Sequence, residues 1–190
     1  MFCLRRQNGA VIGDHFNADH HLTDSSTGKE RLANPLCPHY NTRMKRQLPY
    51  HGWCFVCGNE NPHSIGITWF IEDDGRLTSE FTLTEAHQGP PGHAHGGASA
   101  AILDEAMGLV VWAAGHKVAA VNLEINYHKP LPLHQPIFIE GRITQVDERK
   151  IFSVGEIRMA DSTVAVSGRG IYVVAPKLFE HVRLGKEKKE

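Results

Sequence analysis

One long apolar stretch, Gly97–Trp112, constrains the fold more than any other feature of the chain. Its sequence, GASAAILDEAMGLVVW, is apolar almost all round a helix, which predicts a helix buried on every side. Its only charged residues are Asp104 and Glu105, side by side in the middle. Because a buried carboxylate is costly unless it is paired or used, these two residues are the first candidates for a functional site.

Helical spacing gives the two carboxylates different surroundings. Asp104 shares a face with Gly97, Ala101 and Gly108, and such small side chains let a ligand or a second chain come close to it. The alternative for Asp104 is an ion pair with a basic group at a subunit interface. Glu105 points about 100° away, so we expect it to be a structural hydrogen-bond partner, with a catalytic role as the alternative.

The start of this helix is a second candidate. His95 and Gly96 come directly before Gly97. A helix N-terminus presents unpaired N–H groups and the positive end of the helix dipole, and glycines let a substrate approach that backbone. Such a site can hold an oxyanion. An ordinary flexible loop is the alternative.

The remaining segments favour one sheet around this helix. Two strands joined by an Asp-Gly turn are expected before it, and four strands rich in β-branched residues after it. Consecutive strands with short turns favour an antiparallel meander. The sequence therefore predicts an α+β fold in which one long central helix is wrapped by a curled antiparallel sheet. The expected strands are Ile65–Ile71, Leu77–Leu83, Ala119–Tyr127, Ile137–Val146, Ile151–Arg158 and Val164–Val174.

Composition divides the chain into three parts. Residues 1–50 are polar and without a sustained period, which predicts an irregular N-terminal extension, with a binding arm as the alternative. Residues 51–178 form the expected folded domain, and residues 179–190 a charged C-terminal tail. A length of 190 residues suits one compact domain with an appendage.

Charge and hydropathy exclude several classes of partner. The net charge is −1, from 20 basic and 21 acidic residues, so nothing indicates binding to nucleic acid or to a membrane surface. The first six residues hold no apolar signal-like run, and the longest apolar run, Ala106–Ala114, is well short of the ~20 residues that span a bilayer. We therefore expect a cytoplasmic location with reduced thiols.

At this point the motifs resemble a known family. Residues 87–108, HQGPPGHAHGGASAAILDEAMG, resemble the core motif of PaaI-like hotdog-fold acyl-CoA thioesterases. Residues 54–62 (CFVCGNENP) and 122–132 (NLEINYHKPLP) are similar to flanking segments of that family, and residues 140–142 and 149–150 also fit. The resemblance covers about residues 53–176 and leaves out the first fifty.

The resemblance implies a hotdog fold in a homodimer or homotetramer whose active sites lie between subunits. It implies hydrolysis of an acyl-CoA or acyl-carrier-protein thioester to the free acid and CoA, without a metal or other cofactor. Asp104 is implied to be the general base or the nucleophile, and the Gly96 N–H, with Gly97 nearby, to polarise the thioester carbonyl. A non-catalytic acyl-CoA-binding sensor and a hotdog hydratase or dehydratase remain alternatives.

Further substrate-binding residues are expected around these groups. His95 is expected to brace the glycine loop by hydrogen bonding, with Gln88 beside it. CoA carries several phosphates, so Lys129 and the pair Arg149 and Lys150 are candidates for binding them; solvated surface residues are the alternative.

The strand after the helix departs from the family pattern. Related enzymes often carry Thr or Ser at the position that is Ala120 here. We expect Asn122 on the same strand face, where it could replace the missing hydroxyl.

Two other hydrolase patterns are incomplete. Ser99 lacks the second glycine of a nucleophile elbow and lies inside the helix, so it is interpreted as a helix-face hydroxyl. His93 and His95, with His87 nearby, lack a recognisable third ligand, so a metal pair is not favoured.

The motif Cys54-x-x-Cys57 has three interpretations. It could be half a zinc site or a redox pair, but a second CxxC motif is absent, and Cys37, His51 and His63 follow at irregular spacing. We therefore expect buried structural thiols and no metal.

Overall fold

The computed structural model describes residues 45–180, which form one long helix and one antiparallel sheet. The strand order is β1-β2-β3-β5-β6-β7-β4. No helix in residues 45–180 has the length and apolar character needed to cross a membrane. The elements are β1 (Lys45–Gln47), β2 (Phe70–Glu72), β3 (Leu77–Thr82), η1 (Glu85–His87), α1 (Gly96–Ala113), β4 (Val118–Tyr127), β5 (Pro136–Asp147), β6 (Lys150–Met159), β7 (Val164–Val174) and η2 (Pro176–Phe179).

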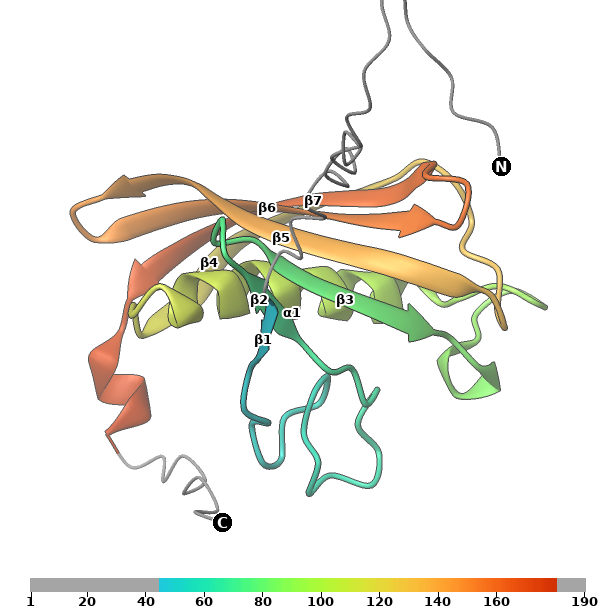
Figure 1. Cartoon of the computed structure of the whole chain (residues 1–190), viewed down its shortest axis with the longest axis horizontal. Helices are drawn as coiled ribbons and strands as arrows, with labels where there is room; N and C mark the ends of the chain where they lie inside the picture. Colours follow the sequence, from blue (N-terminus) through green and yellow to red (C-terminus); the bar gives the residue numbers. More distant parts are fainter. Residues whose placement is uncertain (1–44, 181–190) are drawn as a thin grey trace, which may run out of the picture. The chain divides into compact units, whose positions relative to one another are not determined.

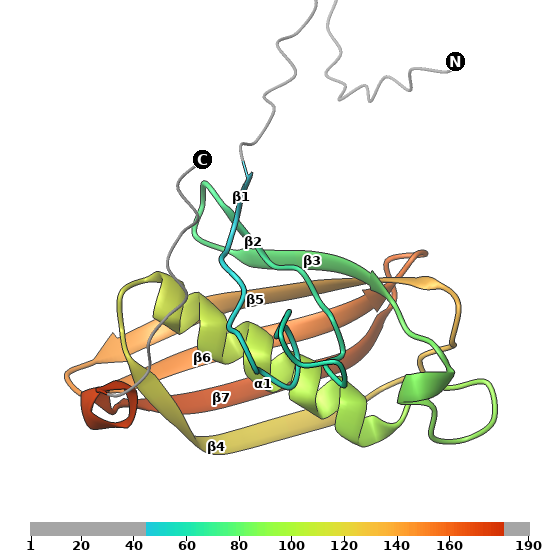
Figure 2. The same ribbon diagram turned by 90° about the horizontal axis from the view of Figure 1, so that it is seen from below.

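The sheet curls round α1, as Figures 1 and 2 show. Strands β5, β6 and β7 pass over the helix, with β4 at one edge of the sheet and the β1–β2 end at the other. Ile102, Leu103 and Met107 of α1 are fully buried in one core with Ile139 and Ile157 of the sheet. The expected hotdog fold, a helix wrapped by a curled antiparallel sheet, is confirmed.

Glycines in the sheet allow the helix to approach closely. A Cβ atom at Gly141 would lie 2.7 Å from the backbone oxygen of Ala106, and one at Gly155 would lie 3.0 Å from Leu103 Cδ2. Ala106 is itself fully buried, so the helix cannot move away from this contact without disturbing the core. Gly141 therefore sets the distance between α1 and β5.

We expect Gly141→Ala to lower the free energy of unfolding by about 2–3 kcal/mol, because the added methyl group meets the helix backbone. Urea unfolding at a fixed protein concentration measures this loss. Gly168→Ala is the matched control, since its methyl group would meet the side-chain ends of Ile125 and Met107, at 3.0 and 3.1 Å, and a backbone atom, the Glu124 oxygen, no closer than 3.4 Å. Equal losses in the two variants would contradict the account.

The segment before α1 differs from the prediction. Of the expected strand Ile65–Ile71, only its end pairs in the sheet, as part of β2. Gly66 has φ +87°, and the N–H groups of Gly66 and Ile67 donate to the Val56 oxygen, so this stretch pairs with a loop instead. The turn at Gly75 is confirmed, with φ +80° and an N–H bond to the Glu72 oxygen.

The folded region also begins before residue 51, because β1 pairs with β2. Otherwise the expected extension over residues 1–50 lies outside the described residues, as does the tail beyond residue 180. The four strands after the helix begin and end within a residue of their predicted positions.

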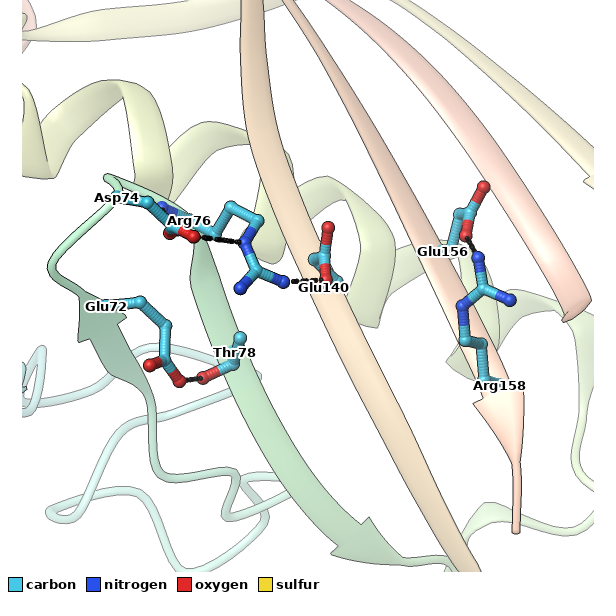
Figure 3. A network of polar contacts seen from close by, with 7 residues as sticks. All are labelled: Glu72, Asp74, Arg76, Thr78, Glu140, Glu156 and Arg158. Atoms are coloured by element: carbon cyan, nitrogen blue, oxygen red, sulfur yellow. Dashed lines mark hydrogen bonds and ion pairs between the residues drawn. The ribbon is translucent and has the colours of Figure 1, made fainter. Parts of the chain in front are cut away.

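A polar network stabilises the face of the sheet turned away from α1 (Figure 3). The Arg76 guanidinium lies between Asp74, at 3.0 Å, and Glu140, at 2.6 Å, and so joins β3 to β5. Glu156 and Arg158 form a second ion pair along β6. Exposed pairs of this kind contribute little each, about 0–1 kcal/mol, so they do not point to a functional site.

Candidate active site

Asp104 lies in a cavity of about 300 Å³ between α1, β4 and β7. The cavity is mostly apolar, and its walls include Leu109, Trp112 and Val118. Phe179 of η2 closes part of it, although that residue falls in the expected solvated tail. The helix sequence predicted a carboxylate among apolar neighbours, and Asp104 is a half-buried carboxylate in a mostly apolar cavity wall.

Tyr172 of β7 is the hydrogen-bond partner of Asp104. Its hydroxyl lies 3.1 Å from Asp104 Oδ1 and donates there or to the Asp104 backbone oxygen, also at 3.1 Å. The ring reaches this position past Gly108, where a Cβ atom would lie 3.2 Å from Tyr172 Cε1. The small residue one turn after Asp104 thus makes room for the tyrosine. Nothing in the pattern of β7 distinguished Tyr172 beforehand.

Burial dominates the ionisation of Asp104. Desolvation raises the pKa of the carboxyl above its ordinary value, the Tyr172 hydrogen bond opposes this, and the nearby Glu105 charge adds to it. A carboxylate with a raised pKa takes up a proton more readily than an ordinary aspartate. This property suits a general base.

Glu105 also lines this cavity, but it hydrogen-bonds to a different set of groups. Its Oε1 accepts from Cys57 Sγ at 3.1 Å and lies 3.5 Å from both Cys54 Sγ and His51 Nδ1. Burial by itself raises the pKa of Glu105, but the hydrogen bonds from His51 and the thiols outweigh it and lower the pKa. The expected role of Glu105 as a hydrogen-bond partner is confirmed, although the sequence did not indicate which groups it meets.

The helix start lies in a second hollow, which Gly96, Tyr127 and Lys129 help to line. His95 caps the helix: its Nδ1 accepts the Gly97 N–H at 2.9 Å, so the expected bracing bond is present. The Tyr127 hydroxyl donates to the Gly96 oxygen at 2.9 Å. Within residues 45–180 the Gly96 N–H donates to no acceptor. Gly96 therefore retains a free donor, whereas the N–H of Gly97 is used by the cap.

Gly96 and Asp104 of one chain lie too far apart to act on the same substrate carbonyl group. Eight residues separate them along α1, which corresponds to about 12 Å of helix. They also line different cavities. A carbonyl oxygen within hydrogen-bond distance of the Gly96 N–H is therefore out of reach of Asp104 of the same chain.

The prediction that Asn122 lies on the same strand face as Ala120 is wrong. A β-bulge interrupts β4 between Ala120 and Asn122, so Ala120 pairs with Tyr172 and Asn122 pairs with Ile171. Paired residues share a face, and successive residues alternate. Ala120 therefore lines the Asp104 cavity, whereas Asn122 lies on the opposite face and cannot supply the missing hydroxyl.

The other predicted binding residues are dispersed. Gln88 Oε1 accepts the Gly92 N–H at 3.1 Å and so stabilises the loop before the helix. Lys129 lies near the helix start. Arg149 lies in the β5–β6 turn and Lys150 begins β6, beside Val174, at the end of the sheet where the Asp104 cavity lies. The structure does not gather the basic residues into one patch within a single chain.

Comparison with known proteins shows which family this part of the chain resembles. Residues 91–166, which hold the helix start, Asp104 and most of the sheet, match the family model described as thioesterase superfamily. A crystal structure of the thioesterase superfamily protein RHA08564 is 38% identical, has a TM-score of 0.62, and covers 64% of this chain and 60% of its own. Over residues 91–166 the chain is therefore similar to the thioesterase superfamily.

Two further proteins show how far this similarity extends. Acyl-coenzyme A thioesterase THEM4 of Bos taurus is 33% identical over 113 residues, which cover 57% of this chain and 46% of the bovine protein. The chain thus spans less than half the length of that relative. A thioesterase protein of Streptococcus pneumoniae, solved with coenzyme A, is 22% identical with a TM-score of 0.52, covers 54% of this chain and 80% of its own, and shares the fold.

Proposed function

We propose that this chain hydrolyses acyl-coenzyme A thioesters to the free acid and CoA. The observation that carries the proposal is Asp104, a half-buried carboxylate with a raised pKa in an apolar cavity. The similarity to a relative named acyl-coenzyme A thioesterase supports the substrate class. The proposal also includes acyl-carrier-protein thioesters as substrates. It further places the chain in the PaaI-like branch of thioesterases and in the cytoplasm.

In the proposed reaction Asp104 takes a proton from water as the oxygen adds to the thioester carbonyl carbon. The carbonyl oxygen becomes an oxyanion, which the Gly96 N–H stabilises at the positive end of α1. The intermediate then collapses, the C–S bond breaks, and the thiolate of CoA leaves and is protonated. Direct attack by the carboxylate, through an anhydride that water later cleaves, gives the same products.

The proposal requires a second copy of the chain, because Gly96 and Asp104 of one chain lie too far apart. The edge strand β4 is a suitable contact. It carries Val121, Leu123 and Tyr127, which are 58%, 37% and 55% exposed, and a long apolar edge strand is normally covered. We propose a dimer in which the helix start of one chain faces Asp104 of its partner.

Thiol release from a panel of short, long and aryl acyl-CoAs tests the proposed activity. We expect steady release of CoA from at least one substrate. Binding of acyl-CoAs without thiol release would favour the sensor, and addition of water to an enoyl-CoA would favour the hydratase. Either result would overturn the proposal.

We expect Tyr172→Phe to move the acid limb of kcat/KM to higher pH by about one unit. The lost hydrogen bond stabilises ionised Asp104, and a bond to a charged group contributes about 1.5–3 kcal/mol, where one pKa unit corresponds to ~1.4 kcal/mol. Asp104 acts as a base only when it is deprotonated, so a higher pKa costs activity at low pH.

A pH profile of kcat/KM measures this shift. Tyr50→Phe is the matched control, because Tyr50 is exposed and its hydroxyl contacts only Thr68 in the described part of the chain. An acid limb that stays in place in Tyr172→Phe would show that Asp104 is not the titrating base.

A further inference from the structure

Beside the Asp104 cavity, four side chains with metal-binding atoms converge. His51, Cys54 and Cys57 lie in the connection between β1 and β2, and Glu105 comes from the middle of α1. Cys57 Sγ lies 3.1 Å from Glu105 Oε1 and 3.5 Å from His51 Nδ1. Glu105 Oε1 lies 3.5 Å from Cys54 Sγ and from His51 Nδ1. Nothing in the proposed hydrolysis uses this cluster.

We propose that His51, Cys54, Cys57 and Glu105 bind one zinc ion through Nδ1, the two Sγ atoms and Oε1. Zinc takes imidazole, thiolate and carboxylate ligands at about 2.0–2.3 Å in tetrahedral geometry, which places neighbouring ligand atoms about 3.3–3.8 Å apart. The four distances given above, 3.1–3.5 Å, are close to these values. His51, Cys57 and Glu105 place their ligand atoms within 4.8 Å of one another; Cys54 falls outside this group and joins it through the 3.5 Å contact of its Sγ with Glu105 Oε1.

The backbone of residues 54–58 forms a tight turn around Cys54. The Val56 N–H donates to Cys54 Sγ at 3.3 Å, and the Gly58 N–H donates to the Cys54 oxygen at 3.0 Å. A Cβ atom at Gly58 would lie only 2.4 Å from that oxygen, so the turn requires glycine. Backbone N–H groups directed at a sulfur favour the thiolate, the form that binds metal.

The composition of the cluster also favours a cation. Glu105 is only 21% exposed; His51 is its one cationic partner among the four side chains, and the two thiols are weak hydrogen-bond donors. A zinc ion replaces the thiol protons, which are released on binding, and adds positive charge beside the carboxylate.

A nucleophilic cysteine is the main competing use of these residues, since Cys57, His51 and Glu105 together have the composition of a cysteine hydrolase triad. Cys57 is 3% exposed, however, and no substrate reaches it. Its hydrogen bond to Cys54, its burial and the Glu105 charge all raise the pKa of its thiol. Such a thiol is a poor nucleophile.

A four-ligand site leaves no open position, so the zinc is structural. It ties the β1–β2 connection to α1 at the residue next to Asp104. It also holds His51, whose ring lies edge-on to Trp112 at 5.2 Å, in the wall of the Asp104 cavity. The site thus stabilises one side of the proposed active site without touching substrate.

Metal analysis of the full-length chain, purified under reducing conditions without chelators, tests the inference. We expect about one zinc ion per chain. Replacement of zinc by Co²⁺ should give the ligand-field and sulfur-to-cobalt charge-transfer bands of a tetrahedral thiolate site. Chelation should lower Tm by about 10 °C or more. These measurements need no variant and no substrate, so their outcome is independent of the proposed hydrolysis.

Variants identify the ligands. We expect Cys54→Ser, Cys57→Ser, His51→Ala and Glu105→Gln each to weaken zinc binding. His63→Ala and Glu60→Gln, which alter exposed residues of the same connection, should keep one zinc ion per chain. A reduced chain without zinc or cobalt bands, a Cys54–Cys57 disulfide, or thiolate bands that persist in the double serine variant would each overturn the inference.

Discussion

Asp104→Asn should lower kcat/KM for acyl-CoA hydrolysis by about a thousandfold, because an amide cannot accept the proton from water. The cavity should keep its shape, since the Asn oxygen can still accept the Tyr172 hydroxyl at the position where Oδ1 now lies. Thiol release measures the loss, and far-UV circular dichroism checks the fold.

The same substitution should leave Tm unchanged or raise it. Burial raises the pKa of Asp104, so the folded state binds its proton more tightly than the unfolded chain does, and the ionised group costs stability at neutral pH. Asparagine removes that cost. Asp161→Asn is the matched control, because Asp161 is an exposed turn residue that accepts the Thr163 N–H. Wild-type turnover in folded Asp104→Asn would rule out the proposed base.

Gly96→Pro should lower kcat by about a hundredfold or more, because proline deletes the free N–H proposed to hold the oxyanion. Proline is tolerated at the first helical position, where the N–H has no helical partner, and His95 before it is already extended, with ψ 136°. Gly96→Ala is the matched control: it keeps the N–H, and its Cβ would lie 3.4 Å from the Tyr127 ring, an ordinary contact.

Mixing the two inactive variants tests whether the site lies between chains. In a mixed dimer, Asp104 of the Gly96→Pro chain would meet the intact helix start of the Asp104→Asn chain. Random reassortment should therefore restore about a quarter of the wild-type rate, since half the dimers are mixed and each holds one complete site. No restoration would contradict the proposed arrangement.

Much of this architecture could be predicted because it depends on local periodicity. The apolar stretch around Asp104 predicted α1 to within a residue at each end, and the β-branched runs predicted the four strands after it. The segment 65–71 could not be predicted in this way. Its composition suits a strand, but the positive φ of Gly66 and the bonds to Val56 turn its first residues out of the sheet.

The sequence predicted candidate-site residues only where a residue's polarity differs from that of its neighbours along the chain. Asp104 and Glu105 were conspicuous because carboxylates are rare on an apolar helix. Tyr172 was not, since a tyrosine in a β-branched strand is ordinary and only the register opposite Ala120 brings it to Asp104. The bulge that moves Asn122 to the other face could not be predicted either, because the alternation of residues along β4 fits the strand in either register.

The sequence by itself determined the helix, the order of the strands and the carboxylates that cannot be buried without a purpose, because these depend on contacts between near neighbours along the chain. Only the tertiary structure decided what each carboxylate meets. Tyr172 reaches Asp104 across 68 residues, and Cys57 reaches Glu105 across 48. Such contacts arise from the packing of α1 against a curled sheet, whose spacing and register depend on glycines and bulges rather than on hydrophobic periodicity.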